Sequence, residues 1–165
     1  MSREDSLNEP GETSVFQMPI RRATPEDIPA LISLERRAST AAHWTTEQYE
    51  AAFASGALPR QFLVVEEQSG VQGFIVGRAI GEEWEIENIA VAEPIRSRGL
   101  GTRLLGEFLD LARGRGARAV FLEVRESNLA ARRLYEKWVF IESGRRRRYY
   151  RDPEEDAISY RLDFA

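Results

Sequence analysis

The chain has 165 residues, enough for one domain that buries about two thirds of its unfolded surface. It contains no cysteine and one histidine, His43, which excludes disulfides and thiolate catalysis and argues against a metal site. With 23 Lys and Arg against 27 Asp and Glu, the net charge is −4, so the composition gives no support to direct nucleic-acid binding.

The first segment, residues 1–15, is polar and acidic and has no hydrophobic period. We expect a flexible tail there, followed by a single domain over residues 16–165. The start of the chain lacks the apolar core of a signal peptide, and no apolar run approaches the ~20 residues of a membrane helix. We therefore expect a cytoplasmic protein with no membrane partner.

Residues 17–22 have the length of a first strand. The sequence from Thr24 to Asp27 then supplies an N-cap, a proline at the first helical position and early negative charge, which predict a helix. A second helix begins after Trp44, with a capping box from Thr45 to Gln48 and a hydrophobic staple between Trp44 and Tyr49. These two helices and their loop could wall a binding site.

Three β-rich segments, residues 62–66, 71–80 and 84–91, are separated by short turns and predict an antiparallel meander. Within the third segment the large apolar residues change phase, which predicts a bulge near Asn88. Such a bulge would splay this strand from its neighbour.

A glycine-containing turn from Arg96 to Gly101 follows, and then a helix from Thr102 to Arg113 with apolar residues at helical spacing. The helix N-terminus leaves N–H groups unpaired at the positive end of the dipole, where a pyrophosphate can bind. Gly99 and Gly101 permit close backbone approach, and the neighbouring arginines add positive charge. The spacing matches neither the nucleoside-triphosphate loop nor the dinucleotide loop. A plain helix-start turn is the alternative.

Residues 118–124 predict the next strand, which completes a parallel β-α-β crossover. In such open sheets, ligands bind where the strands separate, at their carboxyl ends. Ser127 and Asn128 can cap a short helix, and residues 140–150 and 157–164 predict a closing hairpin. The order βααβββαβαββ indicates an α/β fold with a mixed central sheet, helices on both faces, and a splay between strands 4 and 5.

The element order and the glycine turn resemble the GCN5-related N-acetyltransferase (GNAT) superfamily, and residues 87–163 closely resemble its RimI-type ribosomal-protein N-terminal acetyltransferases. The resemblance implies the GNAT fold and acetyl-CoA-dependent transfer of an acetyl group to a protein N-terminus by direct attack in a ternary complex. The family's usual acceptor is ribosomal protein S18. The matching segments are Asn88-Ile89-Ala90-Val91, Arg98-Gly99-Leu100-Gly101, Leu122-Glu123-Val124-Arg125-x-Ser127-Asn128-x-Ala130-Ala131, Leu134-Tyr135-Glu136, Tyr149-Tyr150 and Glu155-Asp156-Ala157.

The same resemblance implies roles for individual residues. Glu123 would be the general base and Tyr135 the general acid. Trp44, Tyr149 and Tyr150 are expected to contact the acceptor. The residues expected to bind acetyl-CoA are Ile89, Ala90, Val91, Arg96, Ser97, Arg98, Gly99, Leu100, Gly101, Thr102 and Asn128.

These residues also have purely structural interpretations. Glu123 could instead pair with Arg125 or Arg98, Tyr135 could be a core tyrosine, and the tyrosine doublet could pair across the hairpin. The run from Arg145 to Arg148 is interpreted as a solvated edge, because alternate arginines of a strand face opposite sides and acidic residues follow closely.

One residue departs from the family pattern. Val139 stands where RimI-like enzymes have a glycine before Phe140. Because valine resists positive φ, we predict a different backbone path here, which bears on the placement of Tyr135. Two other functions stay open: acetyl transfer to a small-molecule amine, and a non-catalytic regulatory module that binds coenzyme A.

Overall fold

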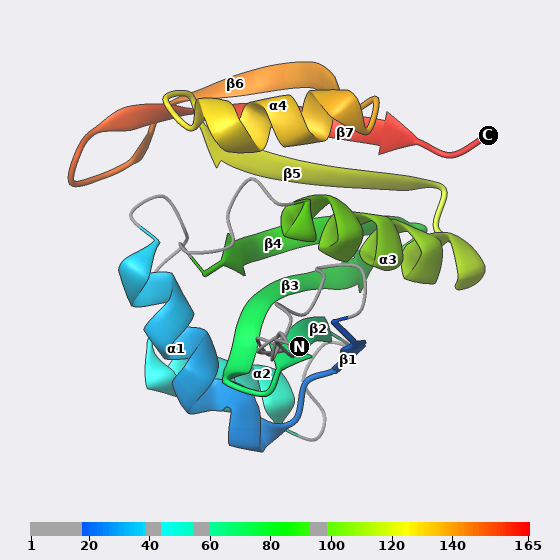
Figure 1. The fold of residues 1–165 in the computed structure, drawn as a ribbon. Helices are drawn as coiled ribbons and strands as arrows, with labels where there is room; N and C mark the ends of the chain where they lie inside the picture. The colour runs from blue at the N-terminus through cyan, green and yellow to red at the C-terminus, as the bar shows by residue number, and fades with distance from the viewer. Residues whose placement is uncertain (1–17, 39–43, 55–59, 93–98) are drawn as a thin grey trace, which may run out of the picture.

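The structure is a computed structural model that describes residues 18–38, 44–54, 60–92 and 99–165 (Figure 1). The predicted tail therefore lies outside the described residues. The order of strands and helices confirms the predicted βααβββαβαββ, with a 3-10 turn before the first helix. In chain order the elements are β1 (Ile20–Arg22), η2 (Pro25–Asp27), α1 (Ile28–Arg37), α2 (Thr46–Phe53), β2 (Arg60–Glu67), β3 (Gly70–Ile80), β4 (Glu83–Val91), α3 (Leu100–Gly114), β5 (Ala119–Arg125), α4 (Leu129–Lys137), β6 (Ile141–Tyr150) and β7 (Glu155–Asp163).

The strands form one seven-stranded sheet in the order β1-β2-β3-β4-β5-β7-β6. β4 and β5 run parallel, and every other neighbouring pair is antiparallel. Two hydrophobic cores lie on opposite faces of this sheet. Leu104 and Phe108 of α3 and Tyr135 of α4 belong to one core, whereas Leu31 of α1 and Tyr49 of α2 belong to the other. Helices therefore cover both faces, as predicted.

The start of α2 has the predicted local structure. The Thr45 hydroxyl accepts a hydrogen bond from the backbone N–H of Gln48, and the Gln48 side chain accepts one from the Thr45 N–H. The rings of Trp44 and Tyr49 pack with their centroids 5.2 Å apart, which confirms the hydrophobic staple. The chain's entry into α2 is thus fixed by contacts within six residues of sequence.

The predicted bulge is present in β4. Val76 of β3 lies opposite Asn88, but the next residue, Gly77, lies opposite Ile86, so Glu87 is an extra residue. The parallel pairing of β4 with β5 ends at the same point, with Ile86 opposite Leu122. Beyond it the two strands separate, as Figure 1 shows. The bulge and the end of pairing together open the sheet at the carboxyl ends of its parallel strands.

The prediction for the α4–β6 connection was wrong. Val139 has a φ of 67° and so takes the left-handed conformation that a glycine would take there. The Val139 N–H donates to the Glu136 carbonyl and the Phe140 N–H donates to the Tyr135 carbonyl, which is the Schellman arrangement. The rings of Phe140 and Tyr135 pack with their centroids 5.7 Å apart. These contacts impose the left-handed conformation on valine, and the connection that positions Tyr135 keeps the glycine path.

No helix within the described ranges is long and apolar enough to cross a membrane.

Candidate active site

A cavity of about 330 Å³ lies where β4 and β5 separate, and both predicted catalytic residues line it. Glu123 alternates along β5 with Leu122 and Val124, which belong to the α3–α4 core. Glu123 therefore faces the opposite side of the sheet from Tyr135, which is part of that core. The two side chains reach one cavity only because the sheet is open between β4 and β5.

Glu123 forms an ion pair that the sequence did not indicate. Its Oε1 lies 2.7 Å from the Nε of Arg146 in β6. The Arg146 side chain is 63% exposed and its guanidinium stacks over the Tyr149 ring, 5.3 Å from the centroid. Arg125, one of the two arginines considered as partners, pairs instead with Glu155. The other, Arg98, lies outside the described residues.

Tyr135 is held inside the core, with its ring packed against those of Phe140 and Tyr160. Burial raises the pKa of its hydroxyl above the ordinary value, and the nearby Tyr150 acts in the same direction. A raised pKa keeps the hydroxyl protonated at neutral pH. Tyr135 is therefore able to donate a proton into the cavity that it lines.

Tyr149 and Tyr150 both line the same cavity, at the end of β6. Their rings contact each other edge to face, with centroids 5.1 Å apart, and Tyr150 lies opposite Glu155 across the hairpin. Tyr150 therefore does pair across the hairpin, as the structural interpretation expects, and its side chain lines the cavity as well. Burial, and then the Glu123 carboxylate, raises the pKa of Tyr150 to about 12. The guanidinium of Arg125 stacks over the Tyr150 ring at 4.4 Å.

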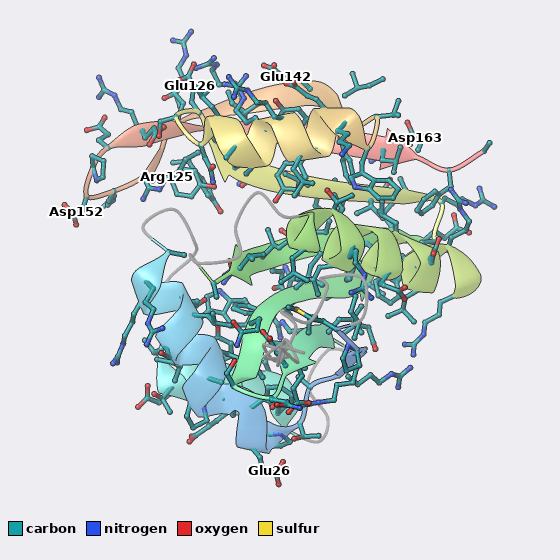
Figure 2. All side chains as sticks on the ribbon, viewed as in Figure 1. Glu26, Arg125, Glu126, Glu142, Asp152 and Asp163 are labelled. Atoms are coloured by element: carbon teal, nitrogen blue, oxygen red, sulfur yellow. The ribbon has the colours of Figure 1, made fainter. Side chains whose placement is uncertain are left out.

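Arg125 ends β5 and Glu126 follows it, and the two side chains point to opposite sides of the strand in Figure 2. Besides its ion pair with Glu155, Arg125 donates to the carbonyls of Arg151 and Pro153 in the β6–β7 turn. Glu126 instead binds Arg145. The two residues thus fasten both sides of the hairpin to the end of β5, which fixes the tyrosine doublet beside the cavity.

A second cavity, of about 340 Å³, lies between the end of β4, the start of α3 and α4. Gly99 is the N-cap of α3 and has a φ of 85°, a left-handed conformation that favours glycine. The first turn of α3 contains no acidic residue, so its positive end is not neutralised. These features fit a pyrophosphate. The predicted coenzyme residues that line this cavity are Ile89, Ala90, Val91, Gly99, Gly101, Thr102 and Asn128.

The remaining predicted coenzyme residues differ in placement. The Leu100 side chain is buried in the α3 core and leaves only its backbone for a ligand. Arg96, Ser97 and Arg98 lie outside the described residues. Of the residues that the structure describes, no group of three or more His, Asp or Glu side chains could hold a metal ion.

The two cavities adjoin, because Ile89, Asn128 and Ala131 line both. The Asn128 side chain caps α4 by accepting a hydrogen bond from the Ala131 N–H at 3.2 Å. The cap orders the first turn of α4, whose Ala131 lines both cavities. Glu123 and Tyr135 line the first cavity on its side of this junction.

Trp44, predicted to contact the acceptor, lines neither cavity. It packs against Tyr49 and Phe62 on the α1–α2 face, with the Arg60 guanidinium 5.7 Å from its ring centroid. Arg60 also binds Glu87, which lines the first cavity, through two hydrogen bonds. Trp44 is therefore connected to the cavity only through other side chains.

Sequence reasoning missed two residues near the site. Arg146 belongs to the arginine run interpreted as a solvated edge, and only the register of β6 against β7 brings it to Glu123. Glu35 is almost fully buried and hydrogen-bonded to Asn88. A signal for Glu35 was present, because its position continues the apolar face that Ile28 and Leu31 begin in α1.

Comparison with known proteins identifies the family. The pattern of the family described as "Acetyltransferase (GNAT) family" matches residues 28–140. The chain belongs to the GNAT acetyltransferase family. GNAT enzymes transfer an acetyl group from acetyl-CoA, so this chain is an N-acetyltransferase with acetyl-CoA as its cofactor.

Several relatives of this GNAT chain carry more specific names. The Escherichia coli K12 protein named "[Ribosomal protein bS18]-alanine N-acetyltransferase" is 38% identical over 135 residues, which are 80% of this chain and 88% of the relative. Mycobacterium tuberculosis "N-alpha-acetyltransferase RimI" is 46% identical over 88 residues, about half the length of each protein, at 53% and 54%. The crystal structure of the E. coli ribosomal-protein-S18-alanine N-acetyltransferase superposes with a TM-score of 0.79 and 32% identity, covering 89% of this chain and 94% of that one.

Proposed function

We propose that this GNAT enzyme acetylates the N-terminal α-amino group of a protein, in the manner of RimI, with a ribosomal protein such as S18 as the acceptor. One observation carries the proposal: Glu123, Tyr135 and the Tyr149-Tyr150 doublet line one cavity that adjoins the coenzyme cavity at Ile89 and Asn128. The names of the relatives support a protein N-terminus as the acceptor. Such an acceptor implies a cytoplasmic enzyme.

In the proposed reaction the amine attacks the thioester directly, within a ternary complex. Glu123 takes one proton from the acceptor ammonium and passes it to water, and the freed amine forms the new N–C bond to the thioester carbonyl. As the C–S bond breaks, Tyr135 gives its proton to the leaving sulfur, and the nitrogen gives up its second proton through water, which restores the Tyr135 hydroxyl. Backbone N–H groups of the splayed end of β4, near Ile89, are suited to stabilise the oxyanion that develops on the carbonyl. Because the chain has no cysteine, the acetyl group cannot pass through an enzyme thioester, which is consistent with direct attack.

Arg146 defines a resting state for Glu123. Its guanidinium sits 2.7 Å from the carboxylate that is to bind an ammonium, so the acceptor's charged amine has a cation to displace. Because the Arg146 side chain is largely exposed, its guanidinium can return to water when the acceptor binds. Until then the ion pair supplies a counter-charge to the Glu123 carboxylate.

A single carboxylate base suits an α-amino group better than a lysine. The α-amino group has an unperturbed pKa of about 8 and the lysine amine one of about 10.4, so deprotonating lysine at neutral pH costs about 3 kcal/mol more. The two rings of the doublet, Tyr149 and Tyr150, are suited to hold the backbone of an extended peptide, which a small amine does not have.

The test compares acetyl-CoA consumption with three acceptors: a free-amine peptide beginning Ala-Arg, the same peptide with a blocked N-terminus and an internal lysine, and a mixture of polyamines. We expect turnover only with the free N-terminus. Turnover confined to the polyamines would move the function to small-molecule acetylation. Tight coenzyme binding with no turnover of any acceptor would favour a regulatory module.

Two variants test the assigned roles. We expect Glu123→Gln and Tyr135→Phe each to lower kcat by about 100-fold or more with little change in acetyl-CoA affinity. Tyr160→Phe is the matched control, because the Tyr160 hydroxyl binds Arg132 and Glu136 outside the cavity. Wild-type kcat in both catalytic variants would refute the acid and base assignments.

A further inference from the structure

Glu35 is a carboxylate inside an apolar core. Its side chain lies in the last turns of α1, is 1% exposed, and is surrounded by the core that includes Leu31 and Phe74. Among the salt bridges between described residues none involves Glu35, whereas the other buried acid of this region, Asp27, is paired with Arg21. Burying a charge without a counter-charge is unfavourable, so an apolar side chain would suit this position better for stability alone.

The two oxygens of Glu35 join elements that are distant in sequence. Oε1 accepts a hydrogen bond from the Asn88 side-chain amide in β4. Oε2 accepts one from the backbone N–H of Trp44, which lies just before α2, at 3.1 Å. A single side chain in α1 thereby ties the entry of α2 to β4. Burial raises the pKa of Glu35 to about 7, which reflects the desolvation of this carboxyl.

Asn88 occupies a decisive position in β4. It is the residue after the extra residue of the bulge, and the parallel pairing with β5 has ended two residues earlier, at Ile86. From there β4 has only β3 beside it, as Figure 1 shows. Ile89, the next residue, lies at the junction of the two cavities. The Asn88–Glu35 contact therefore supports β4 on the α1 face where its second strand neighbour is missing.

We propose that Glu35 is a positioning residue for acetyl transfer: by holding Asn88 and the Trp44 N–H, its carboxyl group fixes the splayed end of β4, and with it the backbone of Ile89, in the geometry that the reaction requires. The inference rests on the proposed location of the reacting carbonyl beside Ile89, and does not depend on which amine is the acceptor. Glu35 touches neither cavity and is not itself a catalytic residue.

The first test is Glu35→Gln, with Asp27→Asn as its matched control. Both substitutions remove a buried carboxylate from the region of α1, but Asp27 binds Arg21 and the Thr24 N–H, at the other end of the helix from β4. We expect Glu35→Gln to lower kcat on the order of 10-fold while the acetyl-CoA Kd changes less than about 2-fold, because α3 is untouched. Asp27→Asn is expected to lower thermal stability and leave kcat unchanged. Equal kcat values in the two variants would overturn the proposal.

A charge swap tests the contact itself. Asn88→Asp places a second carboxylate against Glu35, and we expect it to lower kcat more than Glu35→Gln does. In the double variant Glu35→Gln/Asn88→Asp, the amide introduced at position 35 can donate to the carboxylate introduced at position 88, while its carbonyl accepts from the Trp44 N–H. We expect the double variant to recover kcat above either single variant. A double variant no better than Asn88→Asp would refute a direct role for the contact.

Hydrogen exchange separates this proposal from the proposed acceptor. In Glu35→Gln we expect the backbone amides of residues 88–91 to exchange about 10-fold faster than in the wild type, and those of α3 to be unchanged. This measurement needs no acceptor, so it remains decisive if the N-terminal peptide is not turned over. Unchanged exchange over residues 88–91 would refute the positioning role of Glu35, whatever the acceptor proves to be.

Discussion

Replacing Val139 with glycine should stabilise the protein. Val139 has a φ of 67°, a conformation that costs an L-residue about 1–2 kcal/mol. Its side chain is 67% exposed, so little packing is lost on its removal. Glycine offsets about 0.5–1 kcal/mol of this gain through the greater entropy of the unfolded chain. The net expectation is a gain of about 0.5–1 kcal/mol in the free energy of unfolding, or a rise in Tm of about 1–4 °C.

The assay is urea unfolding followed by circular dichroism, with Val139→Ala as the matched control. Alanine also carries a Cβ and should recover only a small part of the gain, although it removes the same exposed surface. Equal gains for alanine and glycine would assign the effect to the exposed valine side chain. A Val139→Gly midpoint at or below the wild-type midpoint would refute the argument from backbone strain.

Three further predictions use other parts of the molecule. Burial raises the pKa of Glu35 from 4.5 to about 7, so the stability contributed by its protonated form is fully present below pH 4.5 and is lost as pH rises to 7. Relative to Glu35→Gln, the free energy of unfolding of the wild type should fall by about 3 kcal/mol over that interval. A wild-type-minus-variant difference in urea unfolding that does not change with pH would contradict this. Gly77→Ala should destabilise by about 3 kcal/mol, because the new Cβ would overlap both the Phe108 ring and the backbone carbonyl oxygen of Glu85; retention of the wild-type Tm would refute this steric argument. Arg146→Ala should lower the acceptor KM severalfold, because no guanidinium then competes for Glu123; an increased KM in steady-state kinetics would show that Arg146 binds the acceptor.

Features set by neighbouring residues were predictable from the sequence. The capping box at Thr45 and the staple between Trp44 and Tyr49 involve side chains within six positions of one another, and both are present. The bulge near Asn88 was predictable because an extra residue in a strand shifts the apolar alternation by one position, and that shift is visible in the sequence. Together with the strand order, these features locate the opening of the sheet.

Features set by distant contacts were not predictable. The ion pair between Arg146 and Glu123 depends on the register of β6, which slips between Glu142 and Gly144 and again after Arg146. The path at Val139 was wrongly predicted for another reason: valine's intrinsic preference was weighed alone, and two local Schellman hydrogen bonds and the contact between the Phe140 and Tyr135 rings outweigh it. Intrinsic propensity decides conformation only where other contacts leave a choice.

The arginine-rich strand β6 has a consequence for solubility. It is the outer edge of the seven-stranded sheet, and all of its residues except Tyr150 are exposed. An exposed edge offers unpaired backbone groups to other chains and so invites aggregation. Here the run from Arg145 to Arg148 brings like charges together whenever two such edges meet, and the register slips and the left-handed Arg148, with a φ of 53°, interrupt the flat ladder that intermolecular pairing needs. These features oppose pairing between the strand that carries the tyrosine doublet and the same strand of a second copy.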